Sequence, residues 1–151
     1  MSIDHVRFSA AKYLKTSHAY YPAEVRHDLA EAGRVMIAAA GARDDAGSVV
    51  GVQKTYEDAE DINFVLTERG LFLASTGSFY PFLGMRSVES HIEDKLTFRR
   101  ITVEMENGSS FDIDVDSGRG KFRDAYAVSK FLESARARIR QTHPAYRSMP
   151  A

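Results

Sequence analysis

The stretch ITVEMENGSSFDIDV, residues 101–115, decides the fold class, because it reads as two strands joined by a tight turn. Apolar and polar residues alternate on both sides of Glu106-Asn107-Gly108, a pattern typical of strands that bury one face. A type I turn closed by a left-handed glycine is a common hairpin loop of three residues. We therefore predict an antiparallel β-hairpin here.

The length of the loop fixes the register of this hairpin. A three-residue loop sets Val103 opposite Phe111, an apolar pair on one face. A two-residue Asn-Gly turn would instead set Val103 opposite Asp112 and mix the two faces. We therefore predict the three-residue loop. The other pairs that this register predicts are Ile101–Ile113, Thr102–Asp112 and Arg100–Asp114.

The same alternation extends back to Ser48, and it predicts an α+β, mainly β fold. The predicted strands cover 49–56, 61–67, 71–76, 79–83, 85–92, 98–105 and 109–115. After the last strand, apolar residues recur at helical spacing and predict one amphipathic helix over 122–141. These apolar residues are Ala125, Val128, Leu132, Ala135 and Ile139.

The first third of the chain has a helical character. A short helix is predicted near 6–14, and Pro22 suits the first position of a second helix. The apolar stripe of that second helix is Val25, Leu29, Ala32, Met36 and Ala39. Gly33 weakens a helix by roughly 1 kcal/mol relative to alanine, so 34–40 is either helix or strand. The segment 41–47, bounded by glycines, predicts a loop.

LTERGLF, residues 66–72, predicts a second hairpin of the same kind, with Glu68-Arg69-Gly70 as its loop. In that register one face carries Val65, Leu71 and Leu73, and the opposite face is apolar as well. Exposed apolar patches of this size are uncommon on monomers, so the N-terminal helices or another subunit should cover that face. These three residues are therefore a candidate interaction surface.

The composition fits one globular domain of 151 residues, with 44% hydrophobic and 27% charged residues. The absence of cysteine excludes disulfides, thiolate metal sites and a cysteine nucleophile. The N-terminus lacks the apolar core of a signal peptide, and no segment approaches the roughly 18 apolar residues of a membrane span. We therefore expect a cytoplasmic protein with no membrane span.

Charge is spread unevenly along the chain, although the net charge is only −1. Residues 117–147 hold eight Lys or Arg against two acids, which gives +6 and leaves −7 on the first 116 residues. A basic tail of this kind can bind nucleic acid or acidic lipid. It can equally reflect a basic final helix that lies across an acidic sheet, which is the interpretation we favour.

Seven short antiparallel strands followed by one amphipathic helix resemble the pleckstrin-homology-like (PH-like) domains, over about residues 49–141. Three short motifs resemble the bacterial members of that superfamily. They are Leu66-Thr67 before a turn, Tyr80-Pro81 before a strand, and Ser87-Val88-Glu89 within that strand.

The resemblance implies a seven-stranded antiparallel barrel or sandwich closed by the C-terminal helix. The expected organisation is an N-terminal helical extension at 1–47, a PH-like domain at 48–141 and a tail at 142–151. It also implies a non-catalytic interaction module without a cofactor, which binds a protein partner or self-associates as a homo-oligomer. Fold alone is a weak argument for function.

Lipid binding does not follow from the resemblance. Relatives that bind phosphoinositides place Lys and Arg around the first hairpin loop. In KTYEDAEDI, residues 54–62, Lys54 stands alone against four acids, which would repel a lipid headgroup.

The glycine-rich SGRGKF segment fails the test for a phosphate-binding P-loop, which needs four residues between its first glycine and the Gly-Lys pair. Here one residue separates Gly118 from Gly120. A weak anion site at Arg119, Lys121 and Arg123 remains, near the start of the last helix. It supports an alternative function, an anion, phosphate or nucleic-acid binder that uses this loop and the C-terminal helix. Nucleic acid is the less expected ligand, because the arginines of the C-terminal helix are scattered and are not gathered into one basic face. A connector between strand and helix is the simpler interpretation.

No motif predicts metal binding or catalysis. The five histidines lack the i, i+4 spacing of a helical zinc site. The acidic run from Asp112 imitates a calcium loop, but Ser117 and Arg123 occupy the positions that need glycine and glutamate. Ser90 and His91 are neighbours on a predicted strand, so they point to opposite faces. We predict no catalytic residue, and an enzyme is the least expected class.

Overall fold

A computed structural model of the chain describes residues 3–14, 17, 19–55, 59–91, 100–115 and 123–142. The helices are α1 (Ile3–Tyr13), α2 (His27–Ala39), α3 (Arg43–Ala46), the 3-10 turn η2 (Phe82–Gly84) and α4 (Arg123–Thr142). The strands are β1 (Tyr20–Pro22), β2 (Val49–Lys54), β3 (Ile62–Thr67), β4 (Gly70–Leu73), β5 (Ser78–Pro81), β6 (Met85–His91), β7 (Arg100–Met105) and β8 (Ser110–Asp114).

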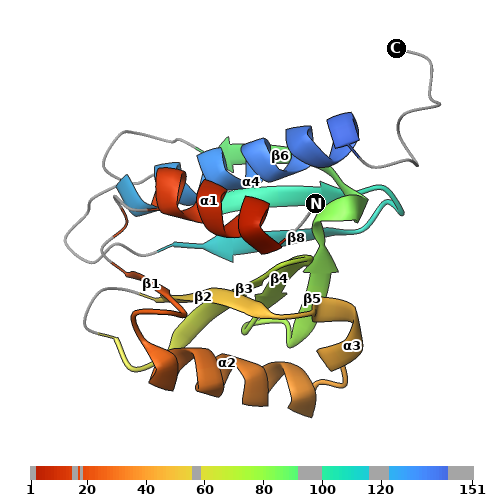
Figure 1. Cartoon of the computed structure of the whole chain (residues 1–151). Helices are drawn as coiled ribbons and strands as arrows, with labels where there is room; N and C mark the ends of the chain where they lie inside the picture. Colours follow the sequence, from red (N-terminus) through yellow and green to blue (C-terminus); the bar gives the residue numbers. More distant parts are fainter. Residues whose placement is uncertain are drawn as a thin grey trace.

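The fold is α+β and mainly β, with two antiparallel sheets. One sheet has the strand order β1-β2-β3-β4-β5, and the other has the order β6-β7-β8. The turn η2 carries the chain from the first sheet into the second (Figure 1). Strands are found at all seven predicted places and α4 at 123–142, so the predicted pattern of strands and final helix is confirmed.

The core has two parts, because the five-stranded sheet is buried on both faces. Its inner face packs against the three-stranded sheet, α1 and α4, and its outer face is covered by α2 (Figure 1). Two further contacts between the sheets, besides this apolar packing, are an aromatic pair and a hydrogen bond. The rings of Tyr80 and Phe111 stack with centroids 3.8 Å apart, and Asn63 Nδ2 donates a hydrogen bond of 2.7 Å to the carbonyl oxygen of Asp114.

The β7–β8 hairpin has the predicted register, with Val103 opposite Phe111. Gly108 has the positive φ of 89° that closes a three-residue loop. On the polar face, Arg100 Nε lies 2.9 Å from Asp114 Oδ1. The remaining predicted pairs, Ile101–Ile113 and Thr102–Asp112, are also present. The register prediction is therefore confirmed.

The predicted register of the β3–β4 hairpin is wrong by one residue. Its loop has two residues, Glu68 and Arg69, and Gly70 belongs to β4. The Thr67 hydroxyl accepts hydrogen bonds from the N–H groups of Arg69 and Gly70, which closes this shorter turn. Gly70 is needed for close packing: a side chain there would lie 2.7 Å from the Phe79 ring and would overlap the backbone of β5.

This shift separates the candidate interaction surface. Val65 faces α2, whereas Leu71 and Leu73 face the space between the two sheets. The exposed fraction of each of the three side chains is at most 1%. The residues predicted to form one surface therefore lie in the two halves of the core.

The N-terminal segment contains a strand as well as helices, so the prediction that Pro22 begins a helix is wrong. Pro22 ends β1, which pairs with β2, and α2 begins at His27. Residues 34–40, for which helix and strand were both expected, are helical up to Ala39. The loop predicted at 41–47 holds the short helix α3. The predicted stripe of α2 is wrong in part: its buried residues are Ala30, Gly33 and Ile37. Of the predicted residues, Leu29 and Met36 pack against this cluster, whereas Val25, Ala32 and Ala39 are exposed.

Both edges of the five-stranded sheet carry a proline. Ala23 donates its N–H to Val50 on the neighbouring strand, so Pro22 points its backbone away from the sheet. Phe82 likewise donates its N–H to Arg69, which leaves Pro81 on the outward side of β5. Proline has no N–H, so these positions offer no donor at the sheet edge.

Gly33 allows α2 to lie close to the sheet, and this contact gives a stability prediction. A Cβ at Gly33 would lie 2.9 and 3.1 Å from the two methyl carbons of Val65, whose χ1 is restricted. Overpacking should cost about 1–3 kcal/mol of unfolding free energy, and the helix-propensity gain of about 1 kcal/mol offsets only part of this cost. We therefore expect Gly33→Ala to destabilise the protein. Urea unfolding measures the change.

The control for this prediction is the same substitution in a Val65→Ala background. There the added methyl group has room, so the cost of Gly33→Ala should disappear. Stabilisation of the otherwise unchanged protein by Gly33→Ala would contradict the close contact.

Tyr20 gives a prediction about pH. Its side chain is buried over Gly51 in the main core, and burial together with the nearby Glu24 carboxylate raises the pKa of the phenol above its ordinary value. The folded state therefore favours the neutral phenol. This contribution is complete below the unfolded pKa of about 10 and is lost as the pH rises above it.

We expect the unfolding free energy of the wild-type protein to fall, relative to Tyr20→Phe, as the pH is raised above about 10. Urea unfolding of both proteins on either side of that pH measures the difference. A difference that stays constant with pH would show that the Tyr20 phenol titrates alike in the folded and unfolded chain.

Candidate functional site

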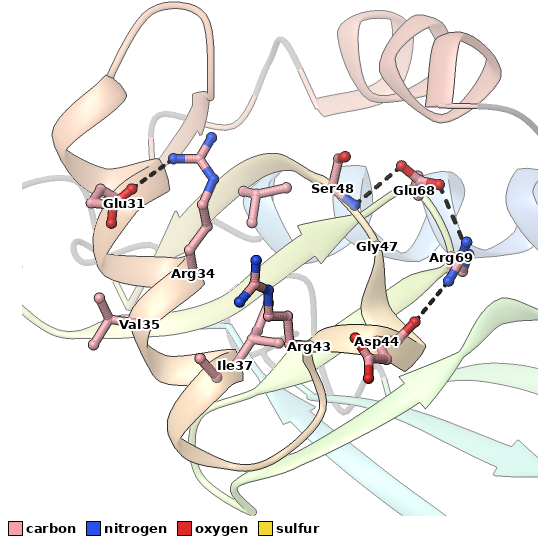
Figure 2. A pocket seen from close by; sticks show the side chains of 12 residues that line it. Glu31, Arg34, Val35, Ile37, Arg43, Asp44, Gly47, Ser48, Glu68 and Arg69 are labelled. Carbon is pink, nitrogen blue, oxygen red and sulfur yellow. Dashed lines mark hydrogen bonds and ion pairs between the residues drawn. The ribbon is translucent and has the colours of Figure 1, made fainter.

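A groove of about 730 Å³ lies at the C-terminal half of α2 (Figure 2). We call it the α2–α3 groove. Residues from three elements line its sides: Arg34 and Val35 from α2, Arg43 and Asp44 from α3, and Glu68 and Arg69 from the β3–β4 turn. The groove thus combines residues that are far apart in the sequence.

The floor of the groove is apolar. Ile37 and Val49 are buried there, because they belong to the cluster that joins α2 to the five-stranded sheet. Val35 stands at the rim with 60% of its surface exposed. An apolar floor beside an exposed aliphatic side chain can accept an aliphatic group from a ligand.

The β3–β4 turn fixes one wall of the groove. The backbones of Glu68 and Ser48 form a hydrogen bond of 2.9 Å, and the Ser48 N–H donates to Glu68 Oε2 at 3.1 Å. Arg69 Nη1 donates to the carbonyl oxygen of Asp44 at 2.8 Å. Gly47 has a φ of 75°, and a Cβ there would lie 2.7 Å from the Glu68 side chain. Side-chain and backbone contacts therefore hold α3 against the turn.

The charged side chains of the groove differ in whether they have partners. Arg34 Nη1 lies 3.0 Å from Glu31 Oε2, and Arg69 Nε lies 3.8 Å from Glu68 Oε1. The Arg43 side chain forms no hydrogen bond or ion pair with the part of the chain that the structure describes. Figure 2 shows its guanidinium extending from α3 toward α2, while the Asp44 carboxylate points the other way.

Other polar clusters are smaller or already paired. Tyr21 lies between Arg26 and Lys54, with the cations 5.2 and 5.6 Å from the ring centroid. Arg26 also bonds Asp28 and lowers the pKa of that carboxyl to about 2. Ser90 shares a 2.7 Å hydrogen bond with Ser129 of α4. None of these groups combines a nucleophile with a base.

Two findings concern metal ions and membranes. Within the described ranges, no group of three or more His, Asp or Glu side chains could hold a metal ion. In the same ranges, no helix combines the length and apolar character that crossing a bilayer requires.

The residues of the candidate anion site fall at the margin of the described structure. Arg119 and Lys121 lie outside the described residues, and Arg123 begins α4 without a described side chain. The groove residues were missed in the sequence, because Arg43 lies in a short polar segment and its neighbours come from distant positions. Val35 carried a weak signal, since it is an apolar residue on a helix that turns it to solvent.

The Glu68 contacts predict how the groove wall responds to mutation. Glu68→Ala removes the acceptor of the Ser48 N–H, so we expect a loss of about 1 kcal/mol in unfolding free energy, typical of one hydrogen bond. Hydrogen exchange at the Ser48 amide should become faster. Glu31→Ala, which breaks an exposed pair within α2, is the matched control and should change neither quantity measurably. Unchanged exchange at Ser48 in Glu68→Ala would show that the side chain does not hold the wall.

The comparisons with known proteins leave the family open. No protein-family model matches this chain, and no curated protein matches it either.

Proposed function

We propose that the protein is a non-catalytic, PH-like interaction module that docks a protein partner in the α2–α3 groove. The order of the elements supports the scaffold: four strands, β2 to β5, precede three strands, β6 to β8, and α4 follows them. The proposal includes a closed barrel formed by the strands β2 to β8. Relative to that barrel, β1 extends the first sheet and α2 covers it.

The observation that carries the proposal is the construction of the groove. It has an apolar floor, a rim of arginines and acids, and a wall held by the β3–β4 turn. Protein interfaces combine an apolar centre with a polar rim in this way, and arginine is enriched in them. A wall that is already ordered also lowers the entropic cost of binding.

The lining favours binding over catalysis. It contains no histidine, and Ser48 supplies its only hydroxyl group. Three arginines face three acids around the groove, so it presents no excess of positive charge to a lipid surface or a nucleic acid.

Two exposed valines provide a test. Val35 lies on the rim of the groove and is 60% exposed, and Val25 lies outside the lining and is 66% exposed. Short random peptides displayed on phage are selected on the immobilised full chain, and the affinity of the selected peptides is measured for each variant. We expect Val35→Glu to weaken binding about tenfold or more, because an unpaired charge replaces an apolar contact. Val25→Glu should bind like the wild type.

Equal binding by both variants would place the peptide site elsewhere, and a selection without binders would count against a peptide-docking module. The second possible partner is another copy of the chain, and light scattering of the wild type detects such a dimer. A dimer that Val35→Glu dissociates would identify self-association through the groove.

A further inference from the structure

We propose that Arg43 anchors the partner through the carboxylate of a Glu or Asp side chain, which lies next to an aliphatic residue of the same segment. This inference rests on the proposed function and names the chemistry that the groove selects. It assigns to Arg43 the main electrostatic contact with the partner.

The contacts of the three groove arginines single out Arg43. Arg34 is paired with Glu31, and Arg69 is bound to the Asp44 carbonyl oxygen and lies near Glu68. Arg43 is exposed, and its side chain has no partner among the residues that the structure describes. Its guanidinium projects into the groove, above the apolar floor (Figure 2). A guanidinium offers a planar pair of donors that matches the two oxygens of a carboxylate.

The charge around the groove favours a ligand group with a single negative charge. One carboxylate would neutralise the one guanidinium that lacks a partner. A phosphate monoester carries nearly two negative charges at neutral pH. The second charge would face Glu31, Asp44 and Glu68 without a free cation to balance it. The groove therefore fits a carboxylate better than a phosphorylated residue.

The backbone of the groove favours a side-chain carboxylate over a chain terminus. Proteins that capture a terminal carboxylate use several free N–H groups. Here the N–H of Gly47 bonds the carbonyl oxygen of Arg43, and the N–H of Ser48 bonds Glu68. The N–H groups of Arg69 and Gly70 are both bound to the Thr67 hydroxyl. These four N–H groups are therefore already bonded and do not serve a terminal carboxylate.

The apolar part of the groove sets the second requirement. Ile37 and Val49 form the floor, and the exposed Val35 lies at the rim. An aliphatic side chain next to the acid in the partner would contact these residues while the acid reaches Arg43. The combination discriminates against a purely acidic segment, which would leave the apolar floor without a contact.

The test uses the peptides that bind the wild type and lose binding with Val35→Glu. Each is synthesised with an acetylated N-terminus and an amidated C-terminus, so that only its side chains carry charge. We expect one Glu→Gln or Asp→Asn change in each peptide to weaken its binding to the wild type about tenfold, the loss of one charge-assisted hydrogen-bonded contact. Fluorescence anisotropy measures the affinities.

Substitutions at Arg43 complete the test. Arg43→Ala should bind the acidic and the amide peptides equally, and Arg43→Glu should prefer a peptide in which lysine replaces the acid. Binding of the lysine peptide by Arg43→Glu also shows that this variant is folded. Arg7→Ala, an exposed arginine on α1, is the control and should keep the preference for the acid.

The outcomes separate the two proposals. Peptides that depend on Val35 but bind Arg43→Ala with an unchanged acid preference would overturn the role of Arg43 and leave the groove as the docking site. A stronger preference for phosphoserine than for glutamate at the same position would overturn the carboxylate assignment. If no selected peptide depends on Val35, both proposals fail.

Discussion

The close contact between α2 and the five-stranded sheet at Gly33 is the constraint on which the rest of the structure depends. Because residue 33 has no side chain, the helix lies directly on Val65 and Val52. This contact allows both faces of the sheet to be buried, the inner one by the second sheet and the outer one by α2. The helix then ends beside α3, and the groove lies between its last turns and the β3–β4 turn.

Sequence-based prediction of register succeeded where the two faces of a hairpin differ in polarity and failed where both faces are apolar. In the β7–β8 hairpin only one face is apolar, so a slip of one residue would bury aspartates and the register is fixed. In the β3–β4 hairpin both faces are apolar, so alternation does not distinguish the two registers. The shorter loop there goes with the hydrogen bonds to the Thr67 hydroxyl and with the fit of Gly70 against β5, and this fit is a tertiary feature that no local pattern contains.

The groove was less predictable than the fold. Two segments separated by 25 residues form its fixed wall, joined through Arg69 and the backbone of Asp44. Pro22 was misjudged for a related reason, since proline suits both the first turn of a helix and the edge of a sheet. Only the pairing partner, β2, distinguishes these two environments. Local periodicity therefore locates the elements, whereas their contacts determine which side chains meet.

The two edge prolines, Pro22 and Pro81, have a consequence for how this protein can be recognised. At each of these two positions the sheet edge offers no N–H to a further strand, whether that strand comes from a partner or from another copy of the chain. Backbone pairing, which accepts almost any sequence, therefore lacks one hydrogen bond at each of these edges. Recognition at these two positions depends more on side-chain contacts, which can diverge by single substitutions while the scaffold stays unchanged.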